Sequence, residues 1–237
     1  MNGDNRFPYP AVRRKLLKWF KANARSYPWR TTSNWFHLLM AEMMLRRTRA
    51  NQAARVYVQF TQQFETPADS AKVESTVLLK MFEPLGLAWR GRQLLQTLDF
   101  LSDSYAKRRP EPSDDLFAIP GVGDYSNAML RNRLFNERLP ALDSNMARLI
   151  CRIEGWSYSA EARRKRQIIE VAHKLVQIKA SRELNLAILD FSALVCKPVH
   201  PVCVGCPLAS HCSYGRKRLN RISGHRVRGS PVNSARM

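Results

Sequence analysis

The sequence of 237 residues has few glycines, few acidic residues and no long apolar segment. No stretch approaches the roughly 20 consecutive apolar residues that a membrane-spanning helix requires. The opening residues, MNGDNRFPYPAVRRK, lack the apolar core of a secretory signal peptide, so we expect an intracellular, cytoplasmic protein. The 10 glycines and the lack of clear strand–turn–strand alternation also argue against a protein built from β-hairpins.

The excess of basic over acidic residues is the main feature of the composition. Lys and Arg number 39 against 19 Asp and Glu, which gives a formal charge of +20. A surplus of this size predicts a polyanionic partner, most often nucleic acid and sometimes an anionic membrane. Residues 216–237 contain basic residues and no acidic one, and we expect them to form a disordered basic tail. The rest of the chain is still strongly basic, so the charge is not confined to the tail.

Apolar residues recur at spacings of three and four along most of the chain, which is the pattern of amphipathic helices. We therefore predict an all-α fold. The expected helices cover residues 11–24, 34–48, 51–64, 70–82, 91–106, 113–118, 124–135, 144–154, 161–178 and 183–194.

Four of the five cysteines are crowded near the end of the chain, in the spacing Cys196-x6-Cys203-x2-Cys206-x5-Cys212. In a reducing compartment they are not expected to form disulfides, so the crowding predicts a metal site. Four thiolates can hold one tetrahedral zinc ion or one 4Fe–4S cluster. Zinc sites usually contain two close pairs, whereas only Cys203 and Cys206 form one here, so a 4Fe–4S cluster is favoured. Cys151 stands alone on an apolar helix face and is expected in the core.

Residues 116–130, LFAIPGVGDYSNAML, contain a glycine-rich turn between two helical segments. Glycine lets the backbone approach another backbone closely, and the N-terminus of the following helix presents free N–H groups. The pattern is typical of a helix-hairpin-helix, whose turn amides can hold a DNA phosphate without reading sequence. An ordinary connection between two helices is the alternative on local evidence.

Two carboxylates occupy unusual places. Asp143 precedes an apolar-periodic run and is expected to cap a helix N-terminus, where the helix dipole favours the ionised form. Glu42 lies in an otherwise apolar helical segment, HLLMAEMMLRRT. Burying an unpaired carboxylate costs several kcal/mol, so Glu42 is either paired with Arg46 four residues on or functional.

These features together resemble the endonuclease III/MutY superfamily of DNA glycosylases, the helix-hairpin-helix (HhH-GPD) family. Glu42 on an apolar helix, the IPGVGDYS turn, Asp143 in ALDSNMARL and the cysteine loop occur in the order of that family. The resemblance extends from about Trp19 to Tyr214.

The resemblance implies two helical domains with a DNA cleft between them. Residues 25–134 would form a six-helix barrel that contains the hairpin. Residues 1–24, as an N-terminal helix, and 135–215 would form a second domain with the 4Fe–4S loop. The basic tail, 216–237, would follow.

Two segments are similar to the Mig-type thymine/uracil mismatch glycosylases: LRRT at Leu45–Thr48, and LNLAILDFSALVC, which ends at Cys196. The resemblance implies base excision repair by a monomer in the nucleoid, through hydrolysis of the N-glycosidic bond of T or U opposite G in double-stranded DNA. One alternative is a MutY-like adenine glycosylase that acts on A opposite G or 8-oxoG. A second is a non-catalytic Fe–S DNA-binding regulator.

The resemblance also implies roles for single residues. Asp143 would stabilise positive charge on the sugar, Glu42 would contact the leaving base, and Tyr125 would line the pocket beside the sugar. Bifunctional members have a lysine at the position of Tyr125, and a phenol cannot form an imine, so weak or no AP lyase activity is expected. Ala50 would be a small residue of the substrate pocket. The predicted DNA contacts are the hairpin residues Gly121, Val122 and Gly123, and the side chains Arg46, Arg47 and Leu87, one of which would fill the space left by the flipped base.

Overall fold

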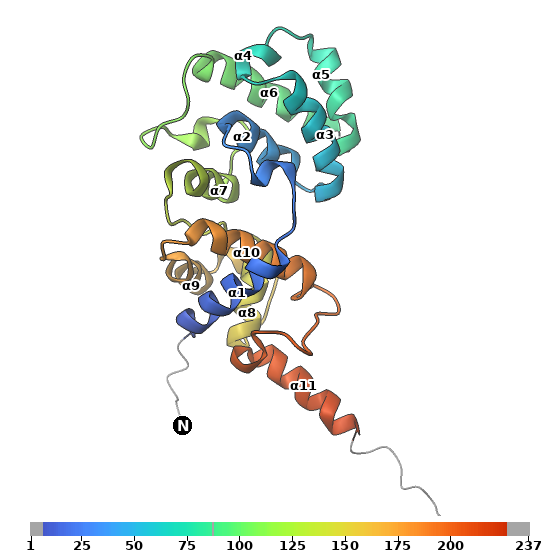
Figure 1. Cartoon of the computed structure of the whole chain (residues 1–237), viewed down its shortest axis with the longest axis vertical. Helices are drawn as coiled ribbons and strands as arrows, with labels where there is room; N and C mark the ends of the chain where they lie inside the picture. The colour runs from blue at the N-terminus through green and yellow to red at the C-terminus, as the bar shows by residue number, and fades with distance from the viewer. Residues whose placement is uncertain (1–6, 87, 227–237) are drawn as a thin grey trace, which may run out of the picture. The chain divides into compact units, whose positions relative to one another are not determined.

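The computed structural model describes residues 7–86 and 88–226, and within these ranges it contains α-helices, short 3₁₀ turns and no strand (Figure 1). The prediction of an all-α fold is confirmed. The same ranges contain no helix that is long and apolar enough to cross a membrane.

Eleven α-helices are assigned in the described residues. Their bounds are α1 Tyr9–Asn23, α2 Trp35–Met44, α3 Ala50–Gln63, α4 Pro67–Ser70, α5 Ser75–Phe82, α6 Ala88–Tyr105, α7 Asp124–Phe135, α8 Ser144–Glu154, α9 Arg166–Val176, α10 Ser181–Leu194 and α11 Ser213–Arg226. The 3₁₀ turns are η1 Pro28–Arg30, η2 Glu83–Leu85, η3 Leu116–Ala118, η4 Ala162–Arg164 and η5 Ala209–His211.

The chain divides into two compact units, each with its own apolar core. The described residues of 1–24 and 142–237 form one, which we call the discontinuous unit, and Arg25–Ala141 forms the other, the central unit. In the central unit, fully buried side chains of α2, α3 and α6 such as Phe36, Phe60 and Leu101 fill the core. In the discontinuous unit, α1 packs on α10, where Trp19 meets Phe191 edge to face with ring centroids 5.2 Å apart. This packing joins the first helix to residues far along the chain.

Several predicted helices differ from the structure at their ends. The segment 34–48 is helical only to Met44, because Arg47 takes a left-handed backbone conformation with φ of 53°. The segment 70–82 is interrupted between α4 and α5. The segment 113–118 contains only the short turn η3, and 161–178 begins its α-helix at Arg166 after η4.

The prediction of disorder in the basic tail is wrong for residues 216–226, which belong to α11. Residues 227–237 lie outside the described ranges. The start of α11 is held by contacts that composition does not reveal. The Gly215 N–H donates to Cys212 Sγ at 3.3 Å, and the Arg216 N–H donates to the Cys212 carbonyl at 2.9 Å. In addition, the Arg152 guanidinium lies over the Tyr214 ring, 4.8 Å from its centroid.

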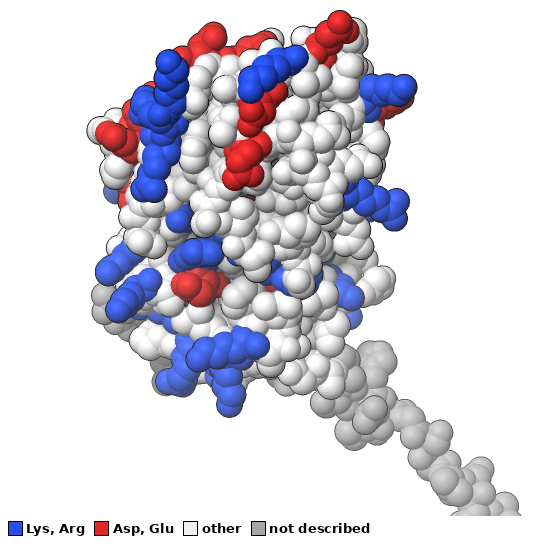
Figure 2. All heavy atoms as spheres, turned by 45° about the horizontal axis from the view of Figure 1, so that its top comes forward, with Lys and Arg blue, Asp and Glu red and all other residues white. Residues whose placement is uncertain are grey.

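The two units differ strongly in charge. The sequence of the discontinuous unit has an excess of 16 basic residues, whereas that of Arg25–Ala141 has an excess of only 4. On the face drawn in Figure 2, acidic side chains are concentrated on the unit that carries α4–α6. A polyanion is therefore attracted mainly to the discontinuous unit.

Candidate functional site

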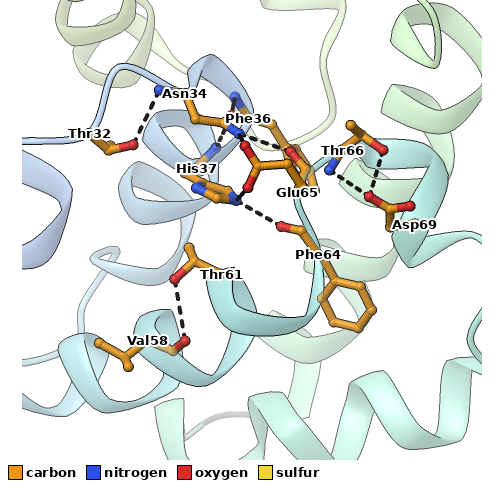
Figure 3. Close-up of polar contacts among 10 residues, drawn as sticks. All are labelled: Thr32, Asn34, Phe36, His37, Val58, Thr61, Phe64, Glu65, Thr66 and Asp69. Atoms are coloured by element: carbon orange, nitrogen blue, oxygen red, sulfur yellow. Dashed lines mark hydrogen bonds and ion pairs between the residues drawn. The ribbon is translucent and has the colours of Figure 1, made fainter.

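Helix α2, which carries Glu42, is fixed at its first turn (Figure 3). Asn34 is the N-cap residue, and its Oδ1 accepts two N–H groups of the first turn at 2.8 and 3.2 Å. The Asn34 side-chain amide donates to the Glu65 carbonyl at 2.9 Å, and Nε2 of the buried His37 lies 2.7 Å from the Phe64 carbonyl. These contacts tie the start of α2 to the end of α3, so helix packing sets the position of Glu42.

Glu42 is a half-buried acid of the central unit. Its Oε2 is shielded from solvent and has no hydrogen-bond partner in the described residues. Burial raises the pKa of Glu42 to about 7, although the charges of Arg133 and Arg30 act to lower it. Both the protonated and the ionised form therefore exist near neutral pH, which suits a group that gives or accepts a proton.

Arg46, the alternative partner for Glu42 in the sequence, is engaged elsewhere. Its Nη1 donates to Gln93 Oε1 at 2.6 Å and to the Gly121 carbonyl at 3.1 Å. The Thr97 hydroxyl donates to the Pro120 carbonyl at 2.8 Å. Arg46 and Thr97 thus attach the glycine turn to α6. In this structure Arg46 holds the hairpin in place through these hydrogen bonds.

The glycine turn connects η3 to α7. The Val122 N–H donates to the Ile119 carbonyl at 3.0 Å and the Val122 side chain is buried, so Val122 anchors the turn. Gly121 has φ of +90°, and a Cβ there would lie 3.2 Å from both Arg46 Nη1 and Met43 Sδ. Gly123, the exposed N-cap residue of α7, offers no side-chain cap to that helix. The exposed, uncapped start of α7 is the kind of surface that accepts a phosphate.

The other predicted residues of the central unit have varied surroundings. Arg47 is exposed and bends the chain between α2 and α3. Ala50, the first residue of α3, is half-buried against the central core, and Tyr125 is half-buried in the first turn of α7. Leu87 lies outside the described residues. The structure thus brings Glu42, Arg46 and the hairpin to connected elements of one unit.

Asp143 is the N-cap residue of α8, as predicted. Its Oδ1 accepts the backbone N–H groups of Asn145 and Met146, both at 2.9 Å, and its Oδ2 accepts the Asn145 side-chain amide at 2.6 Å. Burial raises the pKa of Asp143, and these three hydrogen bonds and the charge of Arg148 act against the rise. The N–H groups at the helix start favour the ionised form, as expected, but desolvation, which the N-cap pattern does not reveal, has the larger effect on the pKa of Asp143.

Sequence reasoning missed Asn145 and Arg148, which support Asp143. Arg148 is buried, and its Nη2 donates to Asn145 Oδ1 at 2.9 Å while its Nε donates to the Cys196 carbonyl at 3.2 Å. A continuous chain of hydrogen bonds therefore leads from Asp143 to the first cysteine of the loop. The available signal was Arg148 itself, one of two arginines in the otherwise apolar run of α8, since a buried arginine requires partners.

The thiols of the cysteine loop lie close enough to influence one another's ionisation. Burial, assisted by the other three thiols, raises the pKa of Cys206 to about 11. Arg152 Nη1 donates to Cys196 Sγ at 3.2 Å, and the Gly215 N–H donates to Cys212 Sγ at 3.3 Å. Four thiols, two of which accept an N–H donor at sulfur, fit the chemistry of a soft metal or an iron–sulfur group. Within residues 7–86 and 88–226, however, no group of three or more His, Cys, Asp and Glu side chains is arranged to hold a metal ion.

Cys151 is fully buried in the core of the discontinuous unit, as expected for the single cysteine. The prediction that it serves packing rather than ligation is consistent with this position.

No family model matches the chain. The chain is 30% identical over 203 residues to a thymine/uracil-DNA glycosylase of Methanothermobacter thermautotrophicus, which covers 85% of this chain and 92% of the relative. It is 29% identical over 213 residues to a thymine-DNA glycosylase of Aeropyrum pernix, an alignment that covers 86% of this chain and 94% of the relative. To the human adenine DNA glycosylase it is 25% identical over 234 residues, which is 93% of this chain but 43% of the relative.

Solved structures agree with these similarities. A thermostable thymine-DNA glycosylase superposes with a TM-score of 0.81 and 29% identity, over 88% of this chain and 97% of that one. Endonuclease III in a non-covalent complex with DNA superposes with a TM-score of 0.73 and 23% identity, over 93% of this chain and 100% of that one. The second match supports the fold alone.

Proposed function

Since the chain belongs to the helix-hairpin-helix superfamily of DNA glycosylases, we propose that it excises thymine or uracil opposite guanine by hydrolysing the N-glycosidic bond in double-stranded DNA. The observation that carries this proposal is the similarity to thymine/uracil-DNA glycosylases along nearly their whole length, in a chain with a half-buried carboxylate at the N-cap of α8. A DNA base is buried in the duplex, so the reaction begins with its extrusion. A mismatched pair costs less to open, which contributes to selectivity.

Asp143 is the proposed catalytic carboxylate. Departure of the base builds positive charge on the sugar, and an ionised carboxylate beside it stabilises that charge and orients the attacking water. Asn145 and the first turn of α8 hold both oxygens of Asp143 in fixed directions. Such preorganisation costs no rearrangement during the reaction.

Glu42 is proposed to act on the leaving base, directly or through a water molecule. Its pKa of about 7 keeps a substantial protonated fraction at neutral pH, so it can donate a proton or hydrogen bond to a base oxygen or nitrogen. The half-buried Ala50 and Tyr125 would form other parts of the pocket.

Tyr125 supports a monofunctional reaction that leaves an abasic site. A phenol cannot form the imine with the sugar that precedes strand cleavage. The sequence has no lysine between Arg108 and Arg164 that could replace it near the hairpin. Weak or no AP lyase activity follows.

The uncapped start of α7 and the hairpin glycines are proposed to hold a DNA phosphate, and the exposed Arg47 to fill the space vacated by the base. Arg46 would act indirectly by clamping the hairpin. The protein is proposed to act as a monomer.

Cys196, Cys203, Cys206 and Cys212 are proposed to hold a 4Fe–4S cluster, which when bound would cross-link the loop and give it a fixed shape. The Arg152 and Gly215 N–H groups already point at two of the sulfurs. Iron and inorganic sulfide in anaerobically purified protein would support this, and zinc in their place would contradict it.

The proposed function is tested with duplexes that contain G·T, G·U, A·G or A opposite 8-oxoG, assayed for abasic sites. Excision of T and U from the first two supports it. Excision of adenine alone would favour the MutY-like alternative, to which the 25% identity with the human adenine enzyme lends weaker support. Tight binding of all duplexes without excision would favour a non-catalytic DNA-binding protein.

A further inference from the structure

A cavity of about 310 Å³ lies beside the C-terminal half of α8 in the discontinuous unit. The side chains that matter here are Arg148, Arg152, Trp156, Tyr158, Tyr214 and Lys217, which come from α8, the segment after it and α11. A helix rises about 1.5 Å per residue, so Arg152 is about 14 Å along α8 from Asp143. The cavity is therefore distinct from the proposed reaction centre, although Arg148 borders one and supports the other.

The charged side chains that line the cavity are all basic. Arg148 and Arg152 hold carbonyl groups of the cysteine loop, and Arg152 donates to the Lys197 carbonyl at 2.7 Å and to the Pro198 carbonyl at 2.9 Å. Lys217 is exposed, and the described residues provide it with no hydrogen bond or ion pair. No carboxylate lines the wall. The cavity therefore favours an anionic ligand, and Lys217 is the cation that remains available for it.

The cavity is also bordered by aromatic rings. Tyr158 is 42% exposed and Tyr214 is 36% exposed, and Trp156 is half-buried. The Arg152 guanidinium over the Tyr214 ring fixes that ring, and the Tyr158 hydroxyl donates to the Ser144 carbonyl at 3.4 Å. Oriented, partly exposed rings beside an available cation form a surface on which a nucleobase can stack while its phosphate is neutralised.

We propose that this cavity binds one unpaired nucleotide of a DNA strand, with the base against Tyr158 and Tyr214 and the phosphate at Lys217. The proposal rests on the proposed function only in taking DNA as the ligand. It assigns to the discontinuous unit a second nucleotide site, besides the place where the excised base reacts. Arg148 borders this cavity and also donates a hydrogen bond to Asn145, which supports Asp143.

The experiment is a titration of the full-length protein with a short fluorescent oligothymidylate, followed by anisotropy. Tyr158→Ala is expected to weaken binding about tenfold, since it removes one base–aromatic stack. Tyr158→Phe keeps the ring and retains the affinity. Lys217→Gln is expected to weaken binding and to reduce its salt dependence by about one phosphate contact. Arg216→Gln removes the same charge from the adjacent position of α11, outside the cavity, and is the matched control.

Equal affinities of Tyr158→Ala and Tyr158→Phe, or equal effects of Lys217→Gln and Arg216→Gln, would overturn the proposal. Excision from a blunt G·T duplex at saturating enzyme is measured on the same variants and is expected to be retained. Absence of excision in the unaltered protein would contradict the proposed function, while the oligomer titration would still decide the proposal for the cavity.

Discussion

Asn145 donates its side-chain amide to Asp143 Oδ2 at 2.6 Å, and this bond fixes the second oxygen of a carboxylate whose first oxygen caps α8. The side-chain oxygen of Asn145, Oδ1, in turn accepts a hydrogen bond from Arg148, which also donates to the Cys196 carbonyl. The proposed catalytic group, the helix start and the cysteine loop thus belong to one hydrogen-bonded assembly. Substitutions at either end of this assembly are therefore expected to alter the orientation or the pKa of the Asp143 carboxylate.

Asp143→Asn is expected to reduce excision on the order of a hundredfold or more, because the charge that stabilises the sugar cation is removed. An asparagine can still cap a helix, so folding and DNA binding should persist. Single-turnover excision from a G·T duplex and the thermal midpoint test these two parts. Near-normal excision by this variant would refute the catalytic assignment.

Arg148→Met is expected to move the acidic limb of the excision–pH profile to higher pH. Arg148 lowers the pKa of Asp143, so its loss lets burial raise that pKa further, and more acid-side activity is lost. The exposed Arg163→Met is the control for removal of one positive charge. A uniform loss of activity with an unmoved limb would indicate that Arg148 has only a structural role.

Glu42→Gln is expected to change how stability depends on pH. The pKa of Glu42 is raised from about 4.5 to about 7 in the folded protein, so the proton it binds stabilises the fold at low pH and this contribution is lost as pH rises through 7. Above pH 7 the ionised, buried form costs up to about 3 kcal/mol. The glutamine variant should therefore have the higher thermal midpoint at alkaline pH and little advantage below pH 5.

The same variant tests the proposed proton donor. If protonated Glu42 assists the leaving base, excision by the unaltered protein declines above pH 7, and Glu42→Gln abolishes that limb at a lower overall rate. An unchanged alkaline limb in the variant would argue against this role.

The sequence predicts helices well where apolar spacing is regular. It fails where single contacts determine the residue at which a helix begins or ends. Helix α7 and the N-cap at Asp143 follow from local rules. The end of α2 at Met44 depends on the left-handed residue Arg47, and the start of α11 depends on Cys212 and Gly215, which spacing does not reveal.

The same limit applies to the candidate site. A pairing of Glu42 with Arg46 was reasonable at four-residue spacing, but the glycine turn lies beside Arg46 and takes its hydrogen bond. The rise in the Asp143 pKa depends on burial, which is a property of the packed helices and not of the N-cap pattern.

Tyr125→Lys is expected to introduce strand scission, because an amine in the first turn of α7 can form an imine with the sugar where a phenol cannot. Borohydride trapping of a covalent protein–DNA adduct measures this gain. Tyr125→Phe serves as the control and should give no adduct. Robust scission by the unaltered protein, without added base or amine, would contradict the monofunctional assignment.

Gly121→Ala and Gly123→Ala separate the structural and the DNA-binding roles of the hairpin. Gly121 has φ of +90°, and an added Cβ would meet Arg46 and Met43 at 3.2 Å, so alanine there should lower stability by roughly 1–3 kcal/mol. Gly123 has φ of −118° and no atom within 4 Å of an added Cβ, so alanine there should cost less, at most about 1 kcal/mol, through the poorer N-cap alone.

The added methyl of Gly123→Ala nevertheless projects from the exposed start of α7, where the proposed phosphate would sit. The affinity of the Gly123→Ala protein for matched and mismatched duplexes should therefore fall by a similar factor, since phosphate contacts carry no sequence information. A Gly123→Ala protein that binds both duplexes like the unaltered protein would show that this turn does not contact the DNA backbone. A loss confined to the mismatched duplex would instead assign the turn to base selection.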